Sequence, residues 1–239
     1  LKEDAAEFAS TWRLEQIVKK HSDFVQFPIY IGDKKEAVNR QTAPWRKAPR
    51  EVTEEQYVEF YKHLTLDFEK LLTAHLVTDA PANVRAILYV PSRRERGVLS
   101  LRTDHGLQLY VRNVLIEEYN KDLLPNAWRF VEGVVESEDL PLNVSRETVQ
   151  SSPAARRIQR ALVRKLVKEL ETMAEERPED YATFWREFGP FIKEGVATDP
   201  SSHGDLLPLL RFHSSRDGGE LVSLRQYVER MPEGQQAIY

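Results

Sequence analysis

The feature that most constrains the fold is a long apolar stripe of helical period in the second half of the chain. Ser152 followed by Pro153 is typical of a helix start, because a hydroxyl can cap free amides and proline lacks an amide that the first turn leaves unbonded. Beyond them, apolar side chains recur every three or four residues, at Ala155, Ile158, Leu162, Leu166, Leu170 and Met173. This spacing predicts an amphipathic helix that buries one face and exposes basic residues elsewhere.

Strand and helix signals are mixed before this stripe, and only helix signals follow it. Thr53 to Gln56 form a capping box and predict a helix whose apolar face continues to Leu72, so this helix should pack on something large such as a sheet. Strands are predicted at 27–31, 84–90, 107–116 and 130–135, and helices at 4–24, 155–173, 181–192, 205–212 and 223–231. The order predicts a layered α/β unit followed by an all-helical module.

The composition of the 239 residues is typical of a folded, soluble protein. Hydrophobic residues make up 41% and charged residues 30%, which excludes wholesale disorder. The net charge of −4 means that any contact with nucleic acid or anionic membrane has to be local. The lack of cysteine excludes disulfides and thiolate sites and fits a reducing cytosol. No apolar run approaches the roughly 18 residues of a membrane span, and Leu1 without a signal-peptide pattern predicts an excised fragment.

The common catalytic patterns are missing from the sequence. The ten glycines form neither a dinucleotide-binding nor a P-loop pattern, and the six histidines form no pair at helical metal-ligand spacing. Carboxylates gather at Glu132, Glu136, Glu138 and Asp139 and could supply an acid and a base, but solvation at a strand end is the simpler interpretation. The basic face of the helix at 155–168 is likewise interpreted as a solvated surface rather than a nucleic-acid site.

The most distinctive segment is the loop at 137–150. Arg146 and Gln150 stand four residues apart and would share one side of a short helical turn. An arginine beside amide side chains suits a terminal phosphate, because its planar guanidinium donates several hydrogen bonds and stays charged at physiological pH. From the residues alone, an ion pair with a carboxylate such as Glu147 or Asp139 is the favoured interpretation, and phosphate binding is the alternative.

This loop resembles the catalytic loop of the heat-shock protein 90 family of ATP-dependent chaperones, in its bacterial form. Five further blocks resemble the family in family order, so the resemblance covers nearly the whole chain: Lys19–Phe24, Pro44–Trp45, Glu59–Lys62, Leu109–Arg112 and Leu221–Leu224. It implies an α+β fold, with a layered αβα sandwich followed by a small all-helical coil module. The implied parts are the tail of an N-terminal ATP-binding domain (1–31), a short linker (32–42), the large αβα unit of the middle domain (43–175) and the coil module (176–239).

The resemblance implies that catalysis is divided between two domains. Arg146 would contact the γ-phosphate of ATP bound in the N-terminal domain, helped by Gln150, while Asn143 orders the loop. Such an arginine stabilises charge on the transferred phosphoryl group only when the two domains have docked. The full-length protein would therefore use ATP with Mg²⁺, whereas this chain alone would bind no cofactor and hydrolyse no ATP.

The resemblance also implies two apolar contact surfaces. Leu115, Leu140 and Leu142 correspond to a patch on which the N-terminal and middle domains dock, and ordinary core packing accounts for them equally well. Leu115 stands where eukaryotic relatives commonly have an aromatic residue. Trp45 corresponds to a tryptophan near a client-binding surface, and a packing anchor is the alternative.

The implied partners are the chain's own N-terminal domain and unfolded or partly folded client proteins, with no nucleic acid and no membrane. The full-length protein would be a homodimer and this piece a monomer. The short linker and the lack of cysteine favour a bacterial cytoplasm. Two other functions stay open: a passive protein-interaction module without nucleotide linkage, and a small phosphotransferase of related fold, against which the missing glycine-rich phosphate loop counts.

Overall fold

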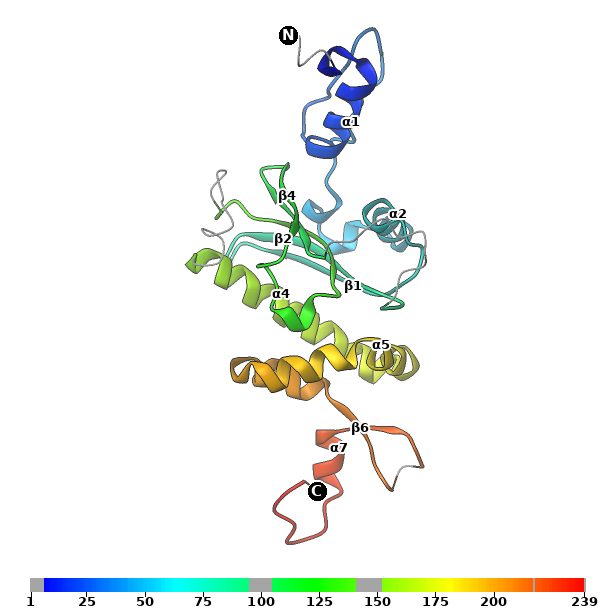
Figure 1. The fold of residues 1–239 in the computed structure, drawn as a ribbon, viewed down its shortest axis with the longest axis vertical. Helices are drawn as coiled ribbons and strands as arrows, with labels where there is room; N and C mark the ends of the chain where they lie inside the picture. Colours follow the sequence, from blue (N-terminus) through cyan, green and yellow to red (C-terminus); the bar gives the residue numbers. More distant parts are fainter. Residues whose placement is uncertain (1–6, 95–104, 141–151, 217, 239) are drawn as a thin grey trace.

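The computed structural model describes residues 7–94, 105–140, 152–216 and 218–238 (Figure 1). Its α-helices are α1 (Thr11–His21), α2 (Glu54–Thr65), α4 (Pro153–Glu176), α5 (Pro178–Thr198), α6 (His203–Leu206) and α7 (Leu224–Glu229). Its strands are β1 (Lys70–Thr78), β2 (Val84–Pro91), β3 (Leu107–Val111), β4 (Val114–Asn120), β5 (Glu132–Glu136), β6 (Arg211–His213) and β7 (Leu221–Ser223). Short 3₁₀ turns are η2 (Pro44–Arg46), η3 (Pro49–Glu51), η4 (Asn126–Trp128), η5 (Pro200–Ser202) and η6 (Leu207–Leu209).

The centre of the fold is a five-stranded sheet in the order β1-β2-β5-β3-β4. β3 and β5 run parallel, and the other neighbouring strands run antiparallel. Side chains of β2 alternate between two cores: Leu88 lies in the larger core, and Ile87 and Tyr89 lie in the smaller one. Because successive residues of a strand point to opposite faces, this alternation shows that the sheet is covered on both sides.

Helices cover the two faces of this sheet. α2 packs Phe60 and Tyr61 into the smaller core, and α4 packs Leu162 and Leu166 into the larger one. α5 lies against α4 on the side away from the sheet (Figure 1). The structure thus confirms the predicted α+β fold with helix, sheet and helix layers.

The sequence signals for helix starts are confirmed. Thr53 accepts a hydrogen bond from the Gln56 amide, and the Gln56 side chain accepts one from the Thr53 amide, which completes the capping box of α2. Ser152 caps α4 by accepting a hydrogen bond from the Ala154 amide. These local bonds satisfy amides that have no partner within their helix.

The predicted continuation of the helix at 53 as far as Leu72 is wrong. α2 ends at Thr65, Leu66 takes a left-handed conformation with φ 59°, and Asp67 accepts hydrogen bonds from the next two amides. The chain then enters β1, where Leu72 pairs with Val90 of β2. The apolar spacing at 68–72 fits either a helix or a strand, and pairing with a neighbouring strand decides between them.

Two further predictions from the sequence are wrong. The segment 27–31 is no strand: its backbone bonds Val38 and the Asn39 side chain instead of a sheet. The C-terminal third is not all helical, because β6 and β7 form a two-stranded antiparallel sheet. The helix predicted at 205–212 is divided into α6, η6 and β6, and the chain becomes extended at Leu210.

The molecule is elongated, with α1 and α7 far apart (Figure 1). α1 lies at one end and buries none of its residues, whereas the hairpin β6–β7 and α7 lie at the other end. Phe24, just beyond α1, is 3% exposed and joins this end to the smaller core. None of the helices in the described residues is long and apolar enough to cross a bilayer.

Candidate functional site

The chain is held firmly where it enters the loop singled out by the sequence. Ser137 follows β5 and donates a hydrogen bond of 2.6 Å from its Oγ to the Asn83 carbonyl. The Asn83 amide in turn donates to Asp139 Oδ2 at 2.9 Å, and Leu140 is buried in the larger core. These contacts fix the backbone up to residue 140.

The chain is held equally firmly where it leaves the loop. Ser152 caps α4, and Ala155 and Ile158 in the first turns of that helix are buried in the same core as Leu140. Both ends of the loop therefore rest on one packed core. Arg146, Gln150, Asn143 and Leu142 fall at 141–151, outside the described residues, so their predicted roles stay predictions.

The two described leucines of the predicted docking patch lie in different cores. Leu115 of β4 is 9% exposed and packs in the smaller core with Phe24 and Tyr110, whereas Leu140 is 3% exposed in the larger core. Their present surroundings are those of ordinary core residues, and the structure does not bring these two together into one patch. Their docking role stays a prediction.

Trp45 is a fully buried packing residue in the described structure. Its ring lies 4.6 Å from the ring of Phe24 and 4.8 Å from that of Tyr110, measured between centroids. Its indole Nε1 donates a hydrogen bond of 2.7 Å to Glu136 Oε2. These contacts match the alternative of a packing anchor, and client binding by Trp45 stays a prediction that would require the ring to leave this cluster.

Glu136 is the residue that sequence reasoning missed. The structure corrects the interpretation of the carboxylate run as solvated, because Glu132 and Glu136 are buried, whereas Glu138 and Asp139 are exposed. The partners of Glu136 lie far away in the chain: Trp45 stands 91 residues before it and Asn113 stands 23 before it. A carboxylate at the end of an apolar strand was the one local signal, and it does not reveal such partners.

Three donors converge on the Glu136 carboxylate. Trp45 Nε1 and Arg46 Nε donate to Oε2 at 2.7 and 2.9 Å, and the Asn113 amide donates to Oε1 at 2.7 Å. Arg46 also donates from Nη2 to Glu138 Oε1 at 3.1 Å. A buried charge needs a counter-charge and hydrogen bonds to be tolerated, and Arg46 with the two N–H groups supplies both. We call Trp45, Arg46, Asn113, Glu136 and Glu138 the Glu136 network.

Two described histidines, His75 and His63, have pKa values that their surroundings lower. Burial lowers the pKa of His75, whose Nδ1 lies 2.6 Å from the Tyr57 hydroxyl. Burial, followed by the charge of Arg40, lowers the pKa of His63, although Asp23 and Glu59 act in the opposite direction. Within the described part of the chain, no three His, Asp or Glu side chains are placed to hold a metal ion.

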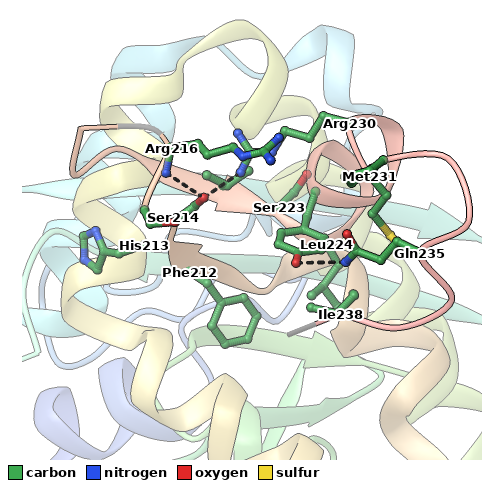
Figure 2. A pocket seen from close by; sticks show the side chains of 14 residues that line it. Phe212, His213, Ser214, Arg216, Ser223, Leu224, Arg230, Met231, Gln235 and Ile238 are labelled. Atoms are coloured by element: carbon green, nitrogen blue, oxygen red, sulfur yellow. Dashed lines mark hydrogen bonds between the residues drawn. The ribbon is translucent and has the colours of Figure 1, made fainter.

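A separate pocket lies at the far end of the molecule, between the hairpin β6–β7, α7 and the tail that follows (Figure 2). It has a volume of about 520 Å³. Arg216 and Arg230 lie at one side of it, where the Ser214 hydroxyl accepts hydrogen bonds from the Arg216 amide and from Arg230 Nη2 (Figure 2). Phe212 and Ile238 supply apolar wall on the opposite side (Figure 2). The described residues that line it include no carboxylate, so these residues offer no acid–base pair of carboxylates.

Comparison with known proteins identifies close relatives. Residues 32–239 match the sequence profile of the family described as Hsp90 protein. Over its whole length the chain is 44% identical to the chaperone protein HtpG of Desulfitobacterium hafniense, 41% identical to that of Geobacter sulfurreducens and 43% identical to that of Chlorobaculum tepidum. It covers 39%, 41% and 38% of these proteins, so the chain spans about two-fifths of the length of the curated relatives it matches.

Proposed function

Because this chain belongs to the Hsp90 family, we propose that it is the middle segment of an ATP-dependent molecular chaperone. In this proposal Arg146 contacts the γ-phosphate of ATP that is bound by a preceding N-terminal domain, with Gln150 beside it and Asn143 ordering the loop. ATP enters as the substrate of the whole protein, together with Mg²⁺. The ten glycines of this chain form no phosphate-binding loop, which supports a nucleotide pocket that lies outside it.

The observation that carries the proposal is the anchoring of the loop at both of its ends. Leu140 before the loop and Ala155 after it are buried in one core, and Ser137 is bonded to the Asn83 carbonyl. Fixed ends keep the side chains of a loop near one region of the surface, so presenting one of them to another domain costs less entropy than it would from a free chain end. A guanidinium presented in this way stabilises the charge that develops on the transferred phosphoryl oxygens.

The proposal makes hydrolysis depend on the docking of the two domains. The chain alone would supply the arginine without the nucleotide and would not turn over ATP. In the full-length protein, which we propose to be a cytoplasmic homodimer, the same segment would also contribute to the binding of unfolded or partly folded client proteins. Nucleic acid and membrane are not among the proposed partners.

The test is ATP hydrolysis by the full-length protein with Arg146→Ala. We expect turnover to fall about 100-fold or more, equivalent to about 2.7 kcal/mol of transition-state stabilisation, while nucleotide affinity changes less than about twofold. Arg177→Ala is the control, since Arg177 is an exposed arginine whose guanidinium pairs with Asp180 three residues away. Equal turnover in the wild type and Arg146→Ala would refute the role of Arg146.

A second measurement separates this function from its two alternatives. The 239-residue chain would be added to the separately purified N-terminal ATP domain, and hydrolysis would be compared with that of each part alone. A rise in rate that is lost with Arg146→Ala supports the divided site. Hydrolysis by the chain alone would favour a phosphotransferase, and no effect in the mixture would favour a passive interaction module.

A further inference from the structure

Phe24 makes a buried contact between the N-terminal end of the structure and the body, and Asp23 and Arg40 contact His63 of α2 beside it. α1 buries no residue, and its ion pair between Lys20 and Glu118 of β4 is exposed and therefore weak. Phe24, by contrast, inserts between the rings of Trp45, Tyr110 and Phe60, with centroid distances of 4.6, 6.0 and 6.2 Å. The docking of residues 7–42 therefore depends on this one aromatic side chain more than on the helix before it.

Asn113 joins the docked Phe24 to Glu136. The Asn113 side chain donates a hydrogen bond of 2.6 Å to the Phe24 carbonyl, and its amide donates one of 2.7 Å to Glu136 Oε1. Arg112 and Asn113 form the two-residue turn between β3 and β4, with left-handed φ values of 49° and 65°. This turn has the conformation that suits a tight hairpin, and it aims both groups of Asn113 at their partners.

Glu136 stands directly before the start of the loop. Its Oε2 accepts hydrogen bonds from Trp45 Nε1 and Arg46 Nε. Arg46 Nη2 also donates to Glu138, two residues further along the chain. The next residues are pinned in turn, because the Ser137 amide donates to the Tyr110 carbonyl at 3.3 Å and the Asp139 amide to Ser137 Oγ at 3.2 Å. A continuous set of hydrogen bonds thus runs from Phe24 to the residues that lead into the loop.

The burial of the Glu136 carboxylate makes this set of hydrogen bonds sensitive to the loss of any one donor. Glu136 is 1% exposed, so its carboxylate cannot replace a lost donor with bulk water. Among the described residues Arg46 is the one arginine bonded to it, and its planar guanidinium bonds Glu136 and Glu138 at the same time. A lysine there would keep the charge but could not reproduce the two-armed geometry.

We propose that Glu136 and Arg46 are positioning residues for ATP hydrolysis, which make the placement of Ser137–Leu140, and with it that of Arg146, depend on the docking of Phe24. This inference rests on the proposed function of Arg146. In it, undocking of residues 7–42 removes the Asn113 bond to Phe24, loosens the hold on Glu136 and lets the start of the loop shift. Such coupling requires one element with two arrangements whose equilibrium both sites shift. Here that element is the backbone after β5, and the two sites are the docked Phe24 and the loop.

The coupling is tested first by hydrogen exchange on the 239-residue chain, which does not involve ATP. Phe24→Ala and Arg46→Lys should each raise the exchange rates of the Ser137 and Asp139 amides by about tenfold, which corresponds to about 1.4 kcal/mol of lost protection. The double variant should raise them by less than the product, since both changes act on one set of contacts. Phe27→Ala is the matched control, because Phe27 lies three residues from Phe24 and is 77% exposed.

The second test measures ATP turnover in the full-length protein with Arg46→Lys. We expect kcat to fall about tenfold while KM for ATP and the melting temperature stay close to the wild-type values. Arg129→Lys is the matched control: Arg129 is 26% exposed against 28% for Arg46, and it pairs with Glu194 of α5 rather than with the Glu136 network. A purely structural role of Arg46 would lower the melting temperature and leave kcat unchanged.

The outcomes separate the two proposals. Unchanged exchange at Ser137 and Asp139 in both variants would overturn the coupling, whatever the ATP turnover shows. Normal kcat with Arg46→Lys, in a protein that Arg146→Ala inactivates, would also overturn it and leave the proposed function standing. If Arg146→Ala has no effect, the proposed function fails and the positioning role fails with it, even if the exchange rates are coupled.

Discussion

Removal of the Phe24 side chain should release the N-terminal end of the structure without unfolding the body. Burial of about 150 Å² of a phenylalanine side chain, at about 25 cal/mol per Å², is equivalent to about 4 kcal/mol. Substitutions of buried phenylalanine by alanine cost about 3–5 kcal/mol. With Phe24 3% exposed and packed against three rings, we take about 3 kcal/mol as the loss in docking free energy for Phe24→Ala.

This loss can be measured by limited trypsin digestion. The segment after Phe24 offers cleavage sites at Lys34, Lys35 and Arg40, and the docked state holds Arg40 against the body, since its Nη2 lies 3.4 Å from Nδ1 of His63 in α2. When opening and closing are fast relative to cleavage, the rate follows the open population, so about 3 kcal/mol predicts cleavage about 100-fold faster or more. The body should stay folded but melt at a somewhat lower temperature, because its larger core contains none of residues 7–42 while its smaller core loses the Phe24 ring.

Phe27→Ala provides the control for this prediction. Phe27 is on the same segment and 77% exposed, so its removal should alter the cleavage rate by less than about twofold. Equal cleavage of the two variants would show that Phe24 does not hold the segment. A large drop in the melting temperature of Phe24→Ala without faster cleavage would show that the segment and the body unfold together.

Two further substitutions test the sheet and its buried histidine. Gly133→Ala in β5 would place a Cβ 2.2 Å from the Ile87 carbonyl oxygen, at a residue whose φ is +142°. We therefore expect the free energy of unfolding to fall by about 3 kcal/mol and the melting temperature by about 6–12 °C. Gly204→Ala, with open space around it, should change the melting temperature little. The pKa of His75 is lowered chiefly by burial, so the folded state binds this proton at a lower pH than the unfolded state does, and stability should fall as the pH decreases below about 6.5. Urea unfolding between pH 7 and pH 5 should show this fall in the wild type and a smaller one in His75→Gln; equal slopes would contradict the assignment.

The parts of the fold that the sequence predicted are those specified by neighbouring residues. The apolar stripe from Ala155 to Met173 and the cap at Ser152 define α4, because the contacts they need lie within a few turns. β1 was missed, since Leu71 and Leu72 fit the helix period that starts at Thr53. The hairpin of β6 and β7 was missed for a related reason: each strand has three residues and too little alternation to give a signal.

In the candidate site, too, the features with a local sequence signal were predicted and those that depend on distant residues were not. The loop at 137–150 was recognisable because its residue order is itself distinctive, and the fixed ends at Leu140 and Ser152 are compatible with the role proposed for it. Glu136 was interpreted as solvated, because a carboxylate at a strand end is solvated unless donors approach from elsewhere. Trp45 could be assigned either to a surface or to a core, and the alternation of polar and apolar residues around it does not decide between them.

The sequence alone determined the starts of α2 and α4, their caps and the family to which the loop belongs, since each is encoded in residues a few positions apart. The tertiary structure decided which charges are buried and which segments are coupled. Trp45 and Arg46 stand 91 and 90 residues from Glu136, and only the closing of the sheet brings their N–H groups within 2.9 Å of one carboxylate oxygen. A buried charge is tolerated only where donors surround it, and a local sequence pattern cannot predict donors that come from distant parts of the chain.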